Sequence, residues 1–494
     1  MTARDLRRDG VVAEGRSPFG VVWGQVYGME HRLASHRAEV FLPQARVLGA
    51  RLTRLFLYWG QLEPAPGQYR WDALDAYAGQ LEPGDEAWVM LASSSPWATR
   101  TPSSIIPSSP ATDPDSYYRF VRTAVERCRG RVRYWQMEFE MSGPFFWAGT
   151  AAEYVTQLAV FRRAVKDADP AARIVLAGFL DGDYETSAPE QDRAAFSDHL
   201  LRAGADLFDL LDLHLYHDAE TIPATIQRFR NAMRTHGCER PIFVGECNGP
   251  GFTQFPENAE VMPDVLRAMH SLAASVQAAD PAEQARHTED EHATMRALYA
   301  RMAELPPQTQ MFMEGCPAEL ERKRHRVNCR ELVMRAVLAL ANGVERVCCF
   351  ALAPDVAGKP DHVLNLLFGK YNLMGYADGA LTERYPSADA FQHLAARLDG
   401  VREVRRRDLP GHPEARVFDV DRAPGPPLTI AWERRDAFTG EDAPSTRISW
   451  PWPYGEAHAV DVFGATVPAS VSDGTLRLPL SNTPVYVQPG PARS

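Results

Sequence analysis

The sequence predicts a protein of the α/β class, a (β/α)8 TIM barrel followed by a smaller all-β sandwich domain. A length of 494 residues is more than a single hydrophobic core usually serves, so two domains are expected. Eight short apolar runs alternate with stretches of helical periodicity, which is the pattern of a parallel α/β sheet or barrel. The last part of the chain instead carries short strand-like runs separated by Pro, Gly and Asp.

The eight apolar runs are the predicted barrel strands, because eight parallel strands close such a barrel. They span residues 20–28, 51–59, 86–94, 131–140, 173–179, 210–216, 240–246 and 345–352. Helices are predicted between them, among others at residues 42–50, 113–128 and 152–168. The last of these helices ends before the Asp-Pro pair at 169–170, as expected for a helix stop.

The domain boundaries follow from these runs. Residues 1–17 are predicted as an N-terminal extension, 18–382 as the catalytic barrel and 383–494 as the β-sandwich. The seventh and eighth strands are about a hundred residues apart, far more than an ordinary strand and helix need. We therefore expect a helical insertion at about residues 251–330, beside the mouth of the barrel.

Composition and charge exclude several classes of partner. Lys plus Arg total 53 against 64 Asp plus Glu, a net charge of −11, and no basic cluster could follow a phosphate backbone, so nucleic acid is not an expected partner. No apolar stretch is long enough to span a bilayer and no secretory signal opens the sequence, so we expect a cytoplasmic protein without a membrane partner. The oligomeric state is not indicated, and a homo-oligomer is left open.

Cysteines and histidines give no metal signature. The seven cysteines are an odd number and show neither CxxC spacing nor histidines in ligand register, so reduced thiols are the simplest interpretation. His214 and His217 are three residues apart on a predicted strand, which places their rings on opposite faces. We therefore expect neither a metal ion nor another cofactor. Only four of the basic residues are lysine, a skew that weakly indicates a GC-rich bacterial genome.

Two glutamates close predicted barrel strands, the place where such barrels carry their functional groups. Glu140 ends the fourth strand and Glu246 ends the seventh. Cleavage of a glycosidic bond needs one carboxyl that protonates the leaving oxygen and a second that attacks or stabilises the anomeric carbon. One glutamate at a strand end is as often salt-bridged or solvated as catalytic, but the joint placement favours a catalytic pair.

Several segments carry a family resemblance. They are residues 48–75 with Arg54, Trp59, the Glu63-Pro64 turn, Gly67 and Trp71; the Pro96-Trp97 pair; residues 134–150; residues 211–218; and residues 240–249. In this order they resemble the second, third, fourth, sixth and seventh strand ends of the clan A glycoside hydrolases, a superfamily of retaining barrel enzymes. The resemblance covers about residues 18–380. It implies a retaining β-glycoside hydrolase with Glu140 as general acid/base, Glu246 as nucleophile, and an oligosaccharide or glycoside as substrate.

Three polar residues are expected beside the glutamate pair. The resemblance implies that Arg54, inside the barrel, holds the nucleophile ionised by charge pairing; a structural ion pair is the alternative. His214 and Tyr216 alternate onto one face of the sixth strand. The resemblance implies that they bind the nucleophile or a sugar hydroxyl, and a buried core histidine is the competing interpretation.

Four tryptophans lie at or just past strand ends, where an indole can stack on a sugar ring. They are Trp23, Trp59, Trp97 and Trp147. Core packing is the more common fate of a tryptophan, so we expect only about half of them to touch the substrate.

The sequence departs from the family pattern in two places. Phe139 stands where the clan usually has an Asn that binds the sugar 2-hydroxyl, and Phe cannot form that bond. Glu138 is a candidate substitute, because alternation along a strand places it on the face of Glu140; a buried ion pair is its alternative role. The eighth run lacks the Trp that many clan members place there, and Phe350 is a candidate replacement.

These departures motivate a second hypothesis of another class. The protein could be a non-catalytic or weakly active carbohydrate-binding protein built on the same barrel. A barrel enzyme of other chemistry is a weaker third hypothesis, since the fold alone permits it but no phosphate loop or metal cluster supports it.

Overall fold

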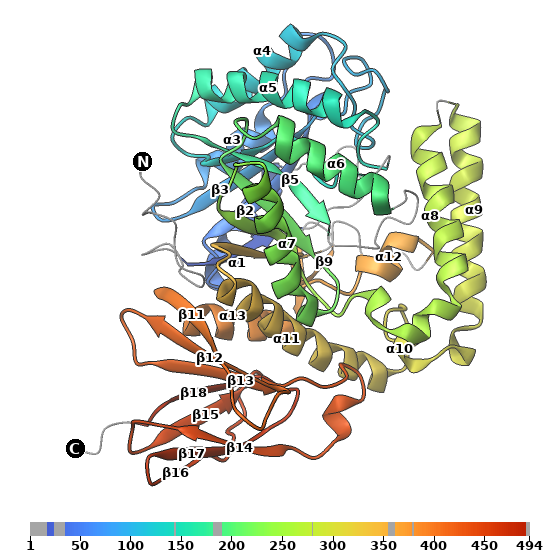
Figure 1. Ribbon diagram of the computed structural model, residues 1–494. Coiled ribbons are helices and arrows are strands. Elements are labelled where there is room, and N and C mark those ends of the chain that lie inside the picture. Colours follow the sequence, from blue (N-terminus) through green and yellow to red (C-terminus); the bar gives the residue numbers. More distant parts are fainter. Residues whose placement is uncertain are drawn as a thin grey trace.

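The computed structural model describes residues 17–23, 35–142, 145–180, 190–278, 280–353, 361–377 and 380–490 (Figure 1). Most of the predicted N-terminal extension and residues 24–28 of the first predicted strand lie outside these ranges. Within them the chain forms a closed barrel, a long helical hairpin beside it and a group of antiparallel sheets.

Eight parallel strands close the barrel in the order of the sequence, which confirms the predicted fold class. They are β1 (Phe19–Val22), β2 (Leu52–Tyr58), β3 (Glu86–Ala92), β4 (Tyr134–Gln136), β5 (Arg173–Leu180), β6 (Leu210–Leu215), β7 (Ile242–Cys247) and β8 (Arg346–Cys349). Each overlaps one of the eight predicted runs. β1 pairs with β8, so the barrel has no open edge.

A helix covers the outside of the barrel after each strand. These helices are α1 (Ser35–Val47), α3 (Asp72–Gly79), α4 (Pro114–Arg127), α5 (Ala151–Ala168), α6 (Glu190–Ala203), α7 (Ile222–Thr235), α11 (Ala318–Ala341) and α13 (Pro386–Arg397); the short α2 (Trp59–Leu62) directly follows β2. Side-chain caps fix two of the starts. The Asp113 carboxylate accepts backbone N–H groups at the start of α4, and Thr150 and Glu153 form a capping box at the start of α5.

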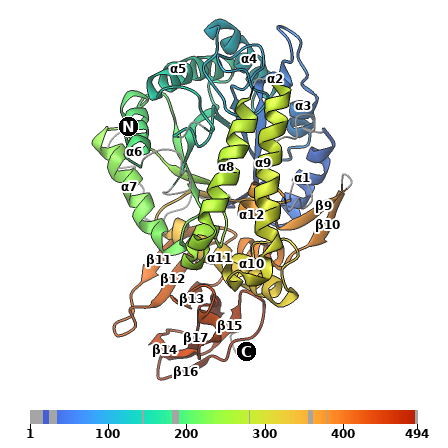
Figure 2. The same ribbon diagram turned by 90° about the vertical axis from the view of Figure 1, so that its right-hand side faces the viewer.

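The expected insertion follows β7. Its elements are η2 (Phe252–Gln254), η3 (Pro256–Glu260), α8 (Met262–Gln277), α9 (Pro281–Ala300), η4 (Met302–Glu304) and α10 (Pro307–Gln310). Helices α8 and α9 pack along each other around buried apolar side chains that include Val265 and Met295. In the view down the barrel they stand in front of its mouth (Figure 2). Helix α11 begins at Ala318, inside the predicted insertion. We assign it to the barrel, because its C-terminal half packs against the barrel.

The chain after β8 forms α12 (Val363–Phe368) and the antiparallel pair β9 (Met374–Ala377) and β10 (Ala380–Arg384). Helix α13 then packs against α11, and its Phe391 ring lies 5.8 Å from the Phe19 ring of β1. The predicted boundary after residue 382 assigns this helix to the second domain. Because α13 completes the ring of barrel helices, we place the junction of the two domains after it.

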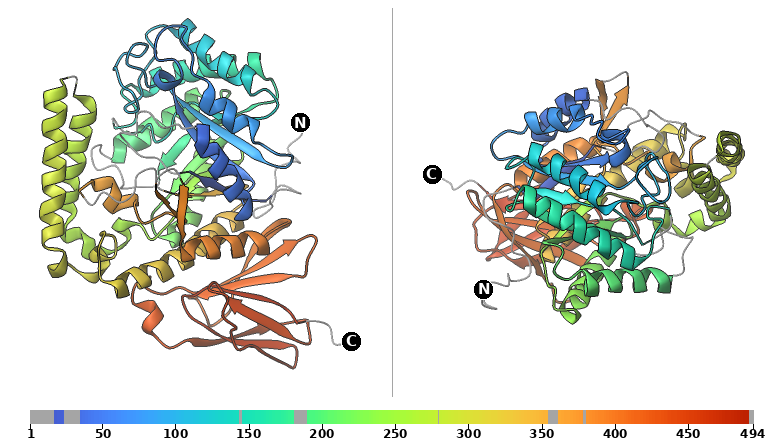
Figure 3. Two further views of the ribbon diagram at one scale, coloured as in Figure 1. Left: turned by 180° about the vertical axis from the view of Figure 1, so that it is seen from behind. Right: turned by 90° about the horizontal axis from the view of Figure 1, so that it is seen from above.

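Antiparallel sheets form the C-terminal part, as expected for a sandwich. One sheet has the order β11 (Val401–Arg407), β12 (Ala415–Arg422), β13 (Leu428–Glu433), β18 (Val485–Pro489) and β15 (Ala457–Asp461); the other has the order β14 (Thr446–Pro451), β17 (Thr475–Leu480) and β16 (Ser470–Ser472), with η5 (Gly440–Asp442) before β14. Buried side chains such as Ile448 and Val487 fill the space between them. The sandwich lies on the barrel side opposite to α4 and α5, away from the hairpin (Figure 3).

The sandwich is joined firmly to the barrel. Trp432 and Phe418 on the larger sheet belong to the same buried cluster as the barrel and its helices. Glu441 in η5 accepts from the guanidinium groups of Arg326 and Arg330 on α11, each at 2.7–2.8 Å. No helix among the described residues is long and apolar enough to cross a lipid bilayer.

Candidate active site

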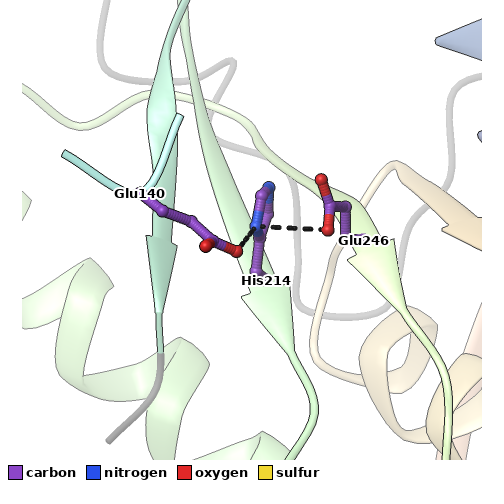
Figure 4. A group of neighbouring side chains, drawn as sticks. All are labelled: Glu140, His214 and Glu246. Carbon is purple, nitrogen blue, oxygen red and sulfur yellow. Dashed lines mark hydrogen bonds and ion pairs between the residues drawn. The ribbon is translucent and has the colours of Figure 1, made fainter. Parts of the chain in front are cut away.

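Ionisable side chains from three barrel strands and from the segment after a fourth meet at the carboxyl ends of the strands. Arg54 comes from β2, Asp212 and His214 from β6, Glu246 from β7, and Glu140 from the segment that follows β4. Figure 4 shows His214 between the two glutamates. All five side chains are buried, with at most 8% of each residue exposed. The two predicted catalytic residues therefore meet in one cluster.

Glu246 is held by two hydrogen bonds. Its Oε1 accepts from Nη1 of Arg54 at 2.7 Å, and its Oε2 accepts from the hydroxyl of Tyr216 at 2.7 Å. Burial raises the pKa of Tyr216 well above its ordinary value, and the nearby charge of Glu246 adds to this, so the phenol remains a donor. Both oxygens of Glu246 are thus oriented by groups that bind a carboxylate.

Glu140 lies in an unusual backbone conformation. Strand β4 ends at Gln136, and Glu140 has φ +50°, in the left-handed region that a non-glycine residue rarely adopts. Its backbone N–H donates to Gly178 O at 3.0 Å, which ties this turn to β5. The Glu140 carboxyl lies 2.6 Å from Nδ1 of His214. Burial raises the pKa of Glu140, while the bond to His214 opposes the rise.

His214 is the positive centre between the glutamates. Its Nδ1 lies 2.6 Å from Glu140 Oε1 and 3.7 Å from Glu246 Oε2, and its Nε2 lies 3.2 Å from Asp212 Oδ2. Burial alone would lower the pKa of His214, but the carboxylates of Glu246 and Asp212 raise it to about 10. The imidazole is therefore protonated at neutral pH.

The charges of the buried cluster balance when Glu140 carries a proton. The two cations, Arg54 and His214, then face two carboxylates, Asp212 and Glu246. An unbalanced charge in a buried site is costly, so this balance favours a proton on Glu140, whose pKa is raised by burial. The arrangement provides a carboxylic acid and a carboxylate side by side, as acid-assisted nucleophilic chemistry needs.

Glu138 does not reach this cluster, contrary to the expectation that it shares a face with Glu140. Tyr134 and Phe139 belong to the buried cluster inside the barrel, so the alternation slips by one residue after β4 ends and Glu138 faces outward. Its Oε1 accepts the backbone N–H and the hydroxyl of Ser93, both at 2.6 Å. Glu138 is therefore no substitute for the missing Asn; it ties the segment that carries Glu140 to the end of β3.

The structure brings none of the four tryptophans to the glutamates. Trp59 and Trp97 donate to the side chain and the backbone of Glu63, each at 2.7 Å, and so brace the Glu63-Pro64 turn. Trp147 packs edge-on against Tyr154 of α5. Trp23 packs edge-on between Phe41 and Tyr376 outside the barrel. The indoles serve packing in the helix layer.

Aromatic rings line the mouth of the barrel beside Glu140. The Phe139 ring lies 5.4 Å from the ring of Phe56 and 4.8 Å from that of Phe146. Phe56 in turn packs under the Arg54 guanidinium, 4.7 Å from its ring centre. Phe350, after β8, lies 6.1 Å from the Tyr216 ring. These partly or fully buried rings give the two glutamates an apolar surrounding.

Two polar residues of the site were missed by the sequence-based analysis. Asp212 accepts from Gln136 Nε2 at 3.1 Å and from Arg54 Nη2 at 3.3 Å, and Gln136 Oε1 accepts from the same Nη2 at 3.0 Å. Both residues could have been found. Asp212 precedes His214 by two residues and Gln136 follows Tyr134 by two, so alternation alone places each inside the barrel.

The cluster also has the composition of a small cation site. Glu140, His214 and Glu246 each offer one ligand atom, and these atoms lie within 4.8 Å of one another. A metal ion would need the neutral ring of His214, and the neighbouring carboxylates raise the pKa of this ring to about 10, so binding would have to displace its proton. The absence of a metal in the reaction remains a prediction.

Fold and site together define a (β/α)8 barrel with a paired-carboxylate centre at the carboxyl ends of its strands. Three solved structures are similar: a family 39 glycoside hydrolase from the gut symbiont Bacteroides cellulosilyticus WH2 (TM-score 0.57, 16% identity, 96% of this chain and 81% of that chain), a glucosidase from Croceicoccus marinus (0.54, 14%, 98% of both) and a family 51 α-L-arabinofuranosidase from Bifidobacterium longum (0.55, 11%, 97% of both). At these identities the likeness shows a shared fold, over the barrel and the C-terminal sheets alike. No protein-family model matches the chain, and no curated protein matches it significantly in sequence.

The environment of Glu138 leads to a prediction about stability. Burial raises the pKa of Glu138 to about 7, above the ordinary value of 4.5 that it regains on unfolding. Between these two pH values the folded protein binds one proton more than the unfolded protein does. Its unfolding free energy therefore falls as the pH rises from 4.5 through about 7. Glu138→Gln removes the titration and should raise the unfolding free energy at pH 8 by up to about 3 kcal/mol relative to wild type, with little difference at pH 5. Chemical denaturation at both pH values measures this; equal differences at both would contradict it.

Proposed function

We propose that the protein is a retaining β-glycoside hydrolase that cleaves an oligosaccharide or glycoside by double displacement. One observation carries the proposal: carboxyl oxygens of Glu140 and Glu246 lie within 4.8 Å of each other. Retaining enzymes have their two carboxyl groups about 5–5.5 Å apart, whereas inverting enzymes need about 6.5–9.5 Å to admit a water molecule. The glycoside hydrolases among the similar solved structures support the substrate class.

In the first step Glu246 attacks the anomeric carbon while Glu140 protonates the leaving oxygen. Arg54 and Tyr216 orient the two Glu246 oxygens, so the attacking atom is fixed before the substrate binds. Burial raises the pKa of Glu140, which favours the protonated form that a general acid needs. The products are a covalent glycosyl ester on Glu246 and a released alcohol.

In the second step the Glu140 carboxylate takes a proton from water, and the resulting hydroxide displaces Glu246 from the anomeric carbon. The imidazolium of His214, 2.6 Å from Glu140, stabilises the carboxylate that this step requires. Configuration at the anomeric carbon is retained because it inverts twice. All seven cysteines are free thiols, which supports the proposal that the enzyme works in the cytoplasm.

The first test is a panel of aryl β-glycosides of gluco, galacto, manno, xylo, arabino and glucurono type. At least one should be hydrolysed, and proton NMR of the initial product should show the β-anomer. An initial α-anomer would exclude the retaining mechanism. Binding of sugars without turnover of any member would instead support the carbohydrate-binding alternative. We expect the activity to be unchanged by EDTA; loss of activity with recovery on metal addition would contradict the metal-free mechanism.

Replacement of either glutamate should lower turnover, but only the effect of replacing Glu140 should depend on the leaving group of the substrate. Glu246→Ala should abolish nearly all turnover on every substrate, because no nucleophile remains. Glu140→Ala should slow natural glycosides by about 10²–10⁴-fold but slow the first step on dinitrophenyl glycosides much less, since a good leaving group needs no proton. Pre-steady-state kinetics on both substrate types measures this. Equal losses on the two would refute the role of Glu140.

Phe139 leads to a prediction about how the site recognises the 2-hydroxyl of the sugar. Hydrogen bonds to the 2-hydroxyl are worth several kcal/mol in such transition states, and the phenyl ring supplies none. Phe139→Asn should therefore raise the ratio of kcat/KM for a glucoside over its 2-deoxy analogue by about tenfold or more. Phe139→Leu, which keeps an apolar side chain, is the matched control and should leave the ratio unchanged. A ratio that does not rise in the Asn variant would show that position 139 does not face the C2 group.

A further inference from the structure

Asp212 is a fully buried carboxylate that takes no part in bond making or breaking in the proposed mechanism. It lies on β6 two residues before His214, and both side chains enter the same cluster. Its Oδ1 accepts the backbone N–H of Gly245 at 2.7 Å. Its Oδ2 lies 3.1 Å from Gln136 Nε2, 3.2 Å from His214 Nε2 and 3.3 Å from Arg54 Nη2. A group desolvated to this extent and bonded on both oxygens is held in one orientation.

The imidazole of His214 thus lies between two carboxyl groups, with Glu140 on Nδ1 and Asp212 on Nε2. Arg54 Nη1 also lies 3.4 Å from Nε2, but a guanidinium has donors only, so it cannot accept the Nε2 hydrogen. Asp212 is the acceptor for that hydrogen. With both ring nitrogens facing carboxyl oxygens, the ring is best satisfied when both carry a hydrogen, which is the charged form.

Two glycines on the neighbouring strands make room for this pair. A Cβ atom on Gly178 of β5 would overlap the His214 ring, and one on Gly245 of β7 would overlap the Asp212 carboxylate. Any other residue at either position would push apart the groups that now touch. The contact between Asp212 and His214 therefore depends on three adjacent strands and not on β6 alone.

We propose that Asp212 is a positioning residue that keeps His214 charged throughout the double displacement, so that Glu140 can change from acid to base. The proposal rests on the proposed function of the site. The charged groups that face His214 are Glu140, Glu246, Arg54 and Asp212, and only the last lies outside the reacting pair with a negative charge. Without Asp212 the Nε2 hydrogen of His214 would lose its carboxylate acceptor and the adjacent negative charge, so the buried imidazolium would give up its proton more readily. Glu140 would then lose its cationic neighbour and hold its own proton more tightly.

The first test is NMR of the histidine rings in the full-length protein, with the His214 signal assigned by its loss in His214→Gln. In the wild type His214 should remain an imidazolium at pH 8. In Asp212→Asn, which is nearly isosteric, the His214 pKa should fall by at least about one unit, a tenfold change in proton affinity. A neutral His214 in the wild type overturns the proposal even if the variant does not fold. An unchanged pKa in a folded Asp212→Asn variant overturns it as well.

Asp209→Asn is a matched control, because Asp209 lies just before β6 and pairs with Lys166, outside the cluster. It should leave the His214 signal unchanged. Where a glycoside substrate has been found, the basic limb of the kcat/KM profile should move to higher pH in Asp212→Asn only, because that limb reports the proton on Glu140. The NMR result does not need turnover, so failure of this inference and failure of the proposed function can be told apart.

Discussion

The site depends on mutual neutralisation of five ionisable groups inside a barrel. Charged side chains lose several kcal/mol of hydration when they are buried, and this loss is offset only if each finds a partner of opposite charge or a hydrogen bond. Arg54 is the residue on which this depends most, since it contacts Glu246, Asp212 and Gln136 together. Its guanidinium can serve three partners because it carries donors in several directions. Arg54 therefore orients the Glu246 carboxylate and lies directly beside the His214 ring.

The turn after β4 decides which side chains enter the site. Had the strand continued, alternation would have sent Glu138 inward. The strand ends at Gln136, and the left-handed conformation of Glu140 turns its carboxyl toward His214. Such a conformation persists only where neighbours hold it, and here Ser93 holds the Glu138 carboxyl while Gly178 accepts the Glu140 N–H. The Glu140 carboxyl is thus positioned from both sides of the barrel wall.

The side chains that surround the two glutamates include several apolar aromatic rings. Phe56, Phe139 and Phe146 form a chain of rings beside Glu140, and the hairpin α8–α9 stands in front of the mouth. Apolar surroundings strengthen the electrostatic contacts of a carboxyl group and raise the free-energy cost of ionising it. Solved structures with the same fold at 11–16% identity show that this fold tolerates wide changes in sequence.

The sequence by itself determined the barrel, because parallel strands are covered on both faces and each becomes a short apolar run that can be recognised without any partner. It also placed Glu246 at the end of a strand and His214 and Tyr216 on the inner face of β6, whereas Glu140, predicted to end a strand, lies in the turn that follows β4. The tertiary structure decided the rest. Contacts across the closed barrel decide whether Trp59 packs in the protein or binds a ligand. They also decide which way Glu138 points and which residues Asp212 contacts. Arg54 and Glu246 are separated by 192 positions in the chain, so no local sequence pattern predicts the hydrogen bond between them. Only closure of the barrel brings such distant charges within hydrogen-bonding distance.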